Sequence, residues 1–139
     1  MSLLVTSNST KAVVNAYYDA AIARDRSMFY PFIHEDFVAV APSYVPLGGK
    51  RHDANSFREV VMPHLDRMLD FSRFNYESLT AEGGHVVALV KIGIADTPHM
   101  VMISEHWEVV DNKALSLLVA FFEPQRVLES MGLTHGLQG

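Results

Sequence analysis

Four long strand-like segments follow one another in the second half of this sequence, and they limit the folds open to it more than any other feature. Short turn signals separate them: a glycine pair at 83–84, Asp-Thr-Pro at 96–98 and Asp-Asn at 111–112. Neighbouring long strands joined by short turns must run antiparallel, so the pattern predicts a strongly curved antiparallel meander. Its strands are expected at residues 71–81, 85–95, 100–111 and 113–123.

Helical spacing dominates the first half of the chain instead. An amphipathic pattern begins behind a cap at Ser9 or Thr10, a short one begins at Ser27, and a third begins behind Asp53 and meets Pro63, which ends or kinks it. A last short helix is expected near the C-terminus, where a glycine follows it. The helices are therefore expected at residues 10–24, 27–33, 53–62 and 125–131, and if Pro63 only kinks the third helix, a further turn continues it through Met68.

One strand and an irregular loop connect the second and third of these helices. The strand is expected over residues 37–41, and the loop over residues 42–51, which contain two prolines and two glycines. Loops of this kind often carry function. Helices that precede an antiparallel meander are typical of an α+β fold in which the helices cover one face of the sheet. We therefore expect the curved sheet and its helices to enclose a cavity.

Composition predicts one domain, residues 1–139, with an apolar interior. Hydrophobic residues make up 49% and charged residues 19% of the chain, which is more apolar side chain than a bare single-layer core requires. The net charge of −5, without a basic run, argues against nucleic acid as a partner. No apolar run approaches the roughly 20 residues that span a bilayer, and no leader pattern is recognisable. We expect a cytoplasmic protein with no membrane partner.

Neither cysteine nor histidine chemistry points to a metal. Cysteine is absent, which excludes disulfides, thiol nucleophiles and Cys-rich zinc sites. The seven histidines are spread from His34 to His135, and none has the His-x-x-x-His or Glu-x-x-His spacing that places two ligands on one helix face. We therefore predict no metal and no other cofactor.

Several segments together carry a resemblance to a known superfamily. They are a Tyr-Tyr helix that ends Ala-Arg-Asp at 23–25, His-Glu-Asp-Phe-Val at 34–38, a glycine pair at 48–49, Glu-His-Trp-Glu-Val at 105–109 and Ala-Phe-Phe-Glu at 120–123. In this order and spacing the chain resembles the nuclear-transport-factor-2-like (NTF2-like) superfamily, in particular its branch of ketosteroid isomerases and SnoaL-like polyketide cyclases. The resemblance implies a cystatin-like cone, in which N-terminal helices pack on a curved, mostly antiparallel sheet that encloses a pocket.

The resemblance also implies candidate catalytic positions. Ketosteroid isomerase uses an Asp base and an oxyanion hole made by a Tyr and a protonated Asp. The family's Tyr falls on Tyr18 and its oxyanion-hole Asp on Glu105, whereas its base falls on Ala41. Because an alanine cannot remove a proton, the sequence departs from the isomerase at the group that starts the reaction.

Strand alternation indicates what Glu105 could do. If Glu105 faces the cavity, Trp107 and Val109 lie beside it, and His106 and Glu108 lie on the opposite face. Burial in an apolar cavity raises the pKa of a carboxyl group, so the neutral acid can donate a hydrogen bond or a proton to a carbonyl or enolate oxygen. A register shifted by one residue would instead leave Glu105 in solvent or paired with an arginine.

A phenol and a set of wall residues complete the predicted site. Tyr18 could donate to the same ligand oxygen, but Tyr17 is one step round the helix and competes for that role, and either could simply be a core tyrosine. Small residues on the first strand would leave room for a ligand, apolar residues on the last strands would form walls, and loop residues would lie at the mouth; core packing or surface exposure is the alternative for each. The predicted substrate-binding residues are Tyr17, Ala39, Ala41, Tyr44, His52, Trp107, Leu117, Val119 and Phe121.

Two functions from different classes follow from these observations. One is a cofactor-independent proton-transfer enzyme of the isomerase, cyclase or dehydratase type that acts on an apolar carbonyl compound. The other is a non-catalytic domain that binds an apolar small molecule or serves as a dimeric interaction module. Under both hypotheses a homodimer through the sheet is expected, because several strands have apolar residues on both faces. These residues are Val38, Val40, Val86, Ala88 and Val90.

Overall fold

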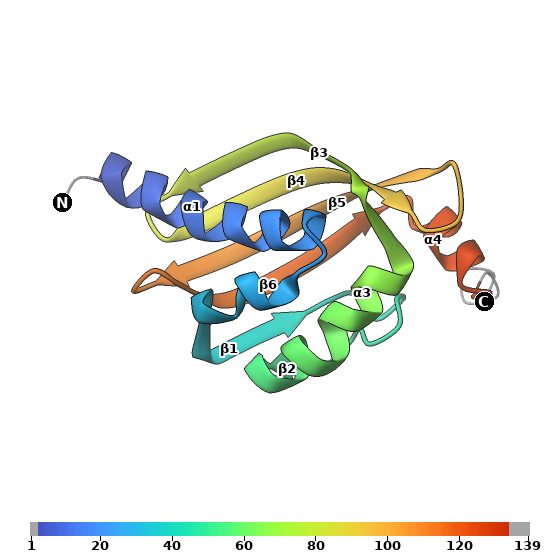
Figure 1. Cartoon of the computed structure of the whole chain (residues 1–139), viewed down its shortest axis with the longest axis horizontal. Helices are drawn as coiled ribbons and strands as arrows, with labels where there is room; N and C mark the ends of the chain where they lie inside the picture. Colours follow the sequence, from blue (N-terminus) through green and yellow to red (C-terminus); the bar gives the residue numbers. More distant parts are fainter. Residues whose placement is uncertain (1–2, 134–139) are drawn as a thin grey trace.

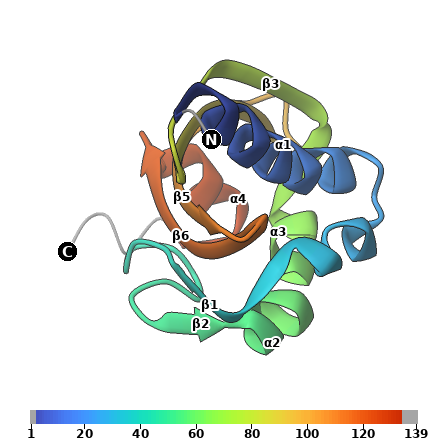
Figure 2. The ribbon, with the colours of Figure 1, turned by 90° about the vertical axis from the view of Figure 1, so that its left-hand side faces the viewer.

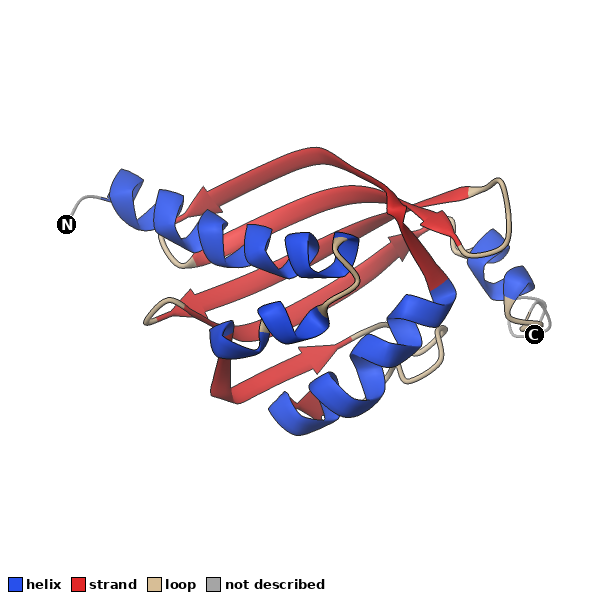
Figure 3. Cartoon of the chain, viewed as in Figure 1, coloured by secondary structure: helices blue, strands red, loops and turns tan. Residues whose placement is uncertain are grey.

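The computed structural model describes residues 3–133, in which helices pack against one face of a six-stranded sheet and a last helix lies at one end of it (Figures 1 and 3). The helices are α1 (Leu3–Ile22), α2 (Ala54–Ser56), α3 (Met62–Met68) and α4 (Gln125–Ser130), with 3₁₀ turns at Arg26–Met28 and Tyr30–Phe32 and a π-helical turn at Phe57–Val61. The strands are β1 (Ile33–Val40), β2 (Arg51–Asp53), β3 (Leu69–Glu82), β4 (His85–Ile94), β5 (Met100–Val110) and β6 (Lys113–Phe122). The predicted α+β order is confirmed.

The sheet has the strand order β2-β1-β6-β5-β4-β3. Strands β3 to β6 form the antiparallel meander that the turn signals predict. Strand β1 lies parallel to β6, with Ala39 opposite Leu117, and the short β2, which was not predicted, pairs antiparallel with β1. Two register shifts against β4 within residues 70–78 of β3 bend that strand, as extra residues in a ladder do. Figure 2 shows the result: the sheet curves around the helices from β3 to β2.

Helix α1 begins at Leu3, so the predicted start behind Ser9 or Thr10 is wrong. Neither residue caps the helix, because the Ser9 hydroxyl donates to carbonyls of the preceding turn and the Thr10 hydroxyl makes a tertiary contact. The Thr10 hydroxyl donates to the Gly83 carbonyl at 2.6 Å, and the Gly83 N–H donates to the Ser7 hydroxyl at 2.8 Å. These buried bonds tie α1 to the β3–β4 turn and hold the helix across the concave face of the sheet.

The segments on either side of β1 also depart from expectation. Residues 27–33 form no continuous helix, because two separate 3₁₀ turns occupy this stretch and β1 already begins at Ile33. The Asp53 cap is confirmed, since its side chain accepts from the Ser56 N–H at 2.8 Å. Pro63 does not end the helical segment that begins behind Asp53, which continues to Met68. The proline lies in the first turn of α3, after a π-helical turn, and a missing N–H is tolerated there.

The hydrophobic core lies between α1, α3 and the concave face of the sheet. Of the five residues expected to leave apolar side chains on both faces of the sheet, Val86, Ala88 and Val90 are fully buried there and cannot form an exposed face. Val38 and Val40 of β1 are half-buried. On the outer face, Leu118 and Phe122 are 56% and 50% exposed. Within residues 3–133 no helix is both long and apolar enough to cross a membrane.

Candidate functional site

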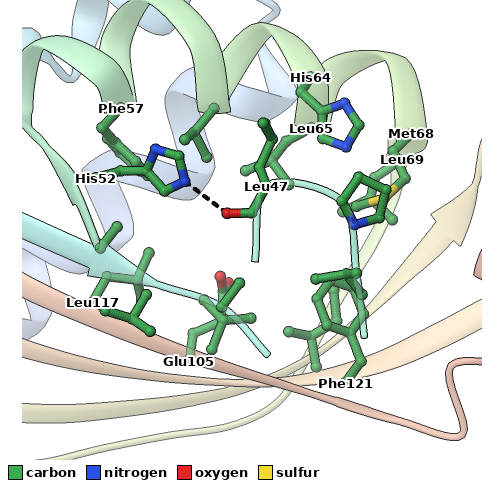
Figure 4. A pocket seen from close by; sticks show the side chains of 18 of the residues that line it. Leu47, His52, Phe57, His64, Leu65, Met68, Leu69, Glu105, Leu117 and Phe121 are labelled. Atoms are coloured by element: carbon green, nitrogen blue, oxygen red, sulfur yellow. Dashed lines mark hydrogen bonds between the residues drawn. The ribbon is translucent and has the colours of Figure 1, made fainter. Parts of the chain in front are cut away.

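Glu105 lies in the middle of β5, opposite Ala88 of β4 and Val119 of β6. Its side chain points to the concave face and is only 6% exposed, and Trp107 and Val109 are buried on the same face. Glu108, on the other face, is exposed. This register places a carboxyl group in the wall of an internal cavity (Figure 4).

Tyr18 is hydrogen-bonded to this carboxyl group and does not line the cavity itself. Its hydroxyl donates to Glu105 Oε1 at 2.6 Å and accepts from Trp107 Nε1 at 3.5 Å. The Tyr18 ring stacks on Phe74 with centroids 4.9 Å apart and meets the edge of Tyr76. Tyr18 and Trp107 are not among the residues that line the cavity. Tyr18 is therefore placed to orient Glu105, with Trp107 supporting it, and Oε1 is the carboxyl oxygen already in use.

Burial gives Glu105 an unusual acidity. Loss of water raises the pKa of its carboxyl group to about 7, against smaller lowering effects from the Tyr18 hydrogen bond and the positive charge of Arg26. Burial and the neighbouring Glu105 also raise the pKa of Tyr18 well above its usual value, so this phenol keeps its proton. Near neutral pH the pair thus consists of a permanent donor, Tyr18, and a carboxyl group that is protonated part of the time.

Tyr17 is the phenol that lines the cavity. Its ring packs edge-on against Trp107 and Phe29, and the Arg26 guanidinium lies 5.2 Å from its centroid. Burial raises the pKa of Tyr17 to about 12, although the positive charge of Arg26 acts in the opposite direction. The hydroxyl therefore stays protonated and serves only as a hydrogen-bond donor or acceptor.

Arg26 is a buried charge that the sequence did not reveal. It is 8% exposed and bonds Asp66 through Nε and Nη2, at 3.0 and 2.7 Å to the same oxygen. Its guanidinium also lies 4.8 Å from the centroid of Phe71. Because Asp66 is distant in sequence, no local pattern could pair the two residues. Arg26 places a fixed positive charge behind Tyr17 and near Glu105.

The cavity between α3, the loop 42–50 and the sheet has a volume of about 50 Å³. Figure 4 shows Glu105, Leu117 and Phe121 on its sheet side and His64, Leu65 and Met68 on its α3 side. Most of the predicted substrate-binding residues line it, and Tyr44 and Trp107 do not. Those that do are Tyr17, Ala39, Ala41, His52, Leu117, Val119 and Phe121.

The two predicted mouth residues hold the loop 42–50 in place. The Tyr44 hydroxyl donates to the Phe121 carbonyl at 2.9 Å and accepts from the Phe121 N–H at 3.1 Å. His52 Nε2 lies 2.7 Å from the Leu47 carbonyl, which can only accept, and Nδ1 lies 2.8 Å from the Ser56 hydroxyl. Both ring nitrogens are thus occupied, so His52 has no free nitrogen for a base role in this arrangement.

Several cavity residues were missed by sequence reasoning. Phe57, Leu65 and Met68 come from the helical segment before β3, and His64 lies among them. Their spacing along residues 57–68 is typical of any buried helix face, so it contains no sign of a cavity. Within residues 3–133 no group of three or more His, Asp or Glu side chains gathers in a way that could hold a metal. His135 lies outside the described residues.

Comparison with solved structures identifies proteins with a similar fold. A protein from Kribbella flavida DSM 17836 superposes with a TM-score of 0.70 at 22% identity, over 92% of this chain and 96% of its own. An NTF2-like protein from Burkholderia thailandensis E264 superposes with a TM-score of 0.68 at 16% identity, over 89% of this chain and 95% of its own. The chain has the NTF2-like fold. No family model matches the sequence, and no curated protein does.

A further solved structure has a provisional chemical assignment. It is that of a second protein from Kribbella flavida DSM 17836, provisionally assigned as a ketosteroid isomerase, with a TM-score of 0.65 at 17% identity, over 84% of this chain and 80% of its own. Sequence identities at this level support a shared fold, and any reaction that this chain catalyses has to be argued from its own residues.

Proposed function

We propose that this NTF2-like protein is a cofactor-independent proton-transfer enzyme, of the isomerase or SnoaL-like cyclase type, that acts on a small carbonyl compound. The observation that carries the proposal is Glu105, a buried carboxyl group on the wall of an apolar cavity, with a pKa of about 7. General acid–base catalysts work best when their pKa lies near the operating pH, because both protonation states are then available.

The division of labour follows from the contacts. Tyr18 occupies Oε1 of Glu105, which leaves Oε2 for the ligand. In its neutral form Glu105 donates a hydrogen bond or a proton to the carbonyl oxygen, and Tyr17 is the second donor on the cavity wall. Charge that develops on the ligand oxygen is also stabilised by Arg26, whose positive charge acts on both Glu105 and Tyr17. Tyr18 thereby becomes a positioning residue.

The size of the cavity restricts the ligand. An apolar cavity of roughly 150 Å³ can bind benzene, whereas this one measures about 50 Å³. A ligand of only a few heavy atoms suits a cavity of this volume, whereas a ring system would need more space than it offers. A small aliphatic ketone is accordingly the first substrate class to test.

A non-catalytic carrier with the same cavity remains the alternative, and a homodimer through the outer face of the sheet fits both functions. The carrier hypothesis leaves the acidity of Glu105 without a role. It also predicts binding of a small ketone without any chemical change in it.

The exchange of C–H protons separates the two functions. Acetone is incubated with the protein in D₂O, and loss of its methyl proton signal is followed by NMR. We expect the wild-type protein to exchange these protons, and Glu105→Gln to lose roughly 10²-fold in rate, the lower end of general acid–base contributions. Glu108→Gln, on the exposed face of the same strand, is the matched control and should keep the full rate. Binding of acetone without exchange by the wild-type protein would favour the carrier.

A further inference from the structure

His64 is a polar group of the cavity that the roles described so far do not use. It lies on α3, which covers the cavity, while Glu105 lies on the sheet. Figure 4 shows the two residues on different sides of the cavity, with the imidazole among the side chains of α3 and the carboxyl group below. A ligand held in the cavity would thus lie between an imidazole and a carboxyl group.

The Nε2 atom of His64 is buried and has no hydrogen-bond partner within residues 3–133. Nearly all buried polar atoms are paired, because an unpaired one costs about 1–3 kcal/mol, so an exception calls for an explanation. Burial and the neighbouring Arg67 lower the pKa of His64, so its ring is neutral at neutral pH. A neutral ring with Nε2 unprotonated has a lone pair that a ligand proton can occupy.

We propose that His64 is the base of the proton transfer, with Nε2 accepting a proton from the carbon next to the ligand carbonyl. This inference rests on the proposed function. It supplies the proton acceptor that Ala41 cannot provide, from the opposite side of the cavity. Of the other titratable side chains that line the cavity, Glu105 is the acid of the same step, both nitrogens of His52 are occupied, and Tyr17 keeps its proton.

The proton and electron balance of the step closes without any further reactant. His64 Nε2 takes the proton as the C–H bond breaks, and the electron pair of that bond forms a C=C bond. The π pair of the carbonyl moves to its oxygen, which takes a proton from neutral Glu105. The enol is neutral, and the imidazolium and the carboxylate carry opposite charges. Return of a proton from His64 to carbon, and of the enol proton to Glu105, restores the protein and leaves an exchanged or isomerised product.

The first test needs no turnover. In ¹⁵N-labelled ligand-free protein at pH 7.5, we expect the His64 ring to be neutral, with its proton on Nδ1 and an unprotonated Nε2; its signals are assigned by their absence in His64→Gln. A proton on Nε2 in this spectrum would overturn the assignment, because a protonated nitrogen cannot accept another proton.

The second test is acetone exchange in D₂O. We expect His64→Gln to lose at least 10²-fold in exchange rate, in the range of general base contributions, and His64→Ala to regain part of it when free imidazole is added. His85→Gln, a change at an exposed histidine of β4, is the matched control and should exchange like the wild type. Urea unfolding of each variant shows whether it is folded under the assay conditions.

The outcomes distinguish this inference from the proposed function. If His64→Gln exchanges within about threefold of the wild type while Glu105→Gln is inactive, the His64 assignment is wrong and the proposed function stands. If the wild-type protein itself produces no exchange above buffer, the proposed function fails, and the base role fails with it. Loss in both variants, with rescue by imidazole only in His64→Ala, supports both.

Discussion

Replacing Glu105 with Gln should change how the stability of the protein depends on pH. The carboxyl group has a pKa of about 7 in the folded protein and an ordinary value of 4.5. The folded state binds this proton more tightly than the unfolded state. Below pH 4.5 the carboxyl group is protonated in both states and costs no stability, whereas the free energy of unfolding falls as the pH rises from 4.5 to 7. Each pH unit in this window is worth about 1.4 kcal/mol, so the loss amounts to about 3 kcal/mol. Glutamine does not titrate and still accepts from Tyr18, so the variant lacks this loss.

The assay is urea unfolding of both proteins at pH 5 and pH 8.5. Groups other than Glu105 titrate alike in the two proteins and cancel in the difference between them. Because part of the loss has already occurred at pH 5, we expect Glu105→Gln to gain about 2.5 kcal/mol of stability relative to the wild type between these two pH values. Stability curves that stay parallel across this range would refute the claim that folding buries an ionisable carboxyl group at this position.

Three smaller predictions follow from other contacts. Tyr18→Phe removes the hydrogen bond that favours the carboxylate, so the pKa of Glu105 should rise above its wild-type value in an NMR titration, whereas an unchanged value would show that the bond is not formed in solution. Gly48→Ala would bring a Cβ atom to 1.8 Å from the Pro42 carbonyl oxygen, so the loop must shift, and urea unfolding should show a loss of about 2 kcal/mol; no loss would mean that the loop has another conformation. Leu118→Glu places a charge on the exposed apolar face of β6, so light scattering should show a smaller mass than for the wild type if that face joins two copies, and equal masses would argue against the dimer.

The meander could be predicted from sequence because its signals are local. Turn residues separate the strands, and the alternation of apolar residues sets which side chains face inward, Glu105 included. The start of α1 could not be predicted, since the role of Thr10 depends on Gly83, a partner far along the chain. Strand β2 was missed for a similar reason: it is three residues long and exists only because β1 offers a free edge.

The inward orientation of Glu105 was predicted from the sequence, whereas its surroundings were predicted less well. Sequence reasoning weighed both adjacent tyrosines, but spacing alone could not tell which lines the cavity, because Tyr17 and Tyr18 are both almost completely buried. Arg26 and His64 were not recognised at all. Arg26 matters because it pairs with Asp66, which is distant in sequence, and His64 matters because its buried Nε2 has no partner. Neither feature can be recognised from neighbouring residues in the sequence.

The most direct test of this account is a ¹³C NMR titration of the Glu105 side-chain carboxyl carbon in the ligand-free protein, assigned with the help of Glu105→Gln. The account predicts a midpoint near pH 7, because the carboxyl group is buried beside an apolar cavity with a single donor from Tyr18. A midpoint near the ordinary value of 4.5 would contradict it, since a well-solvated carboxylate could not serve as the proton donor proposed here.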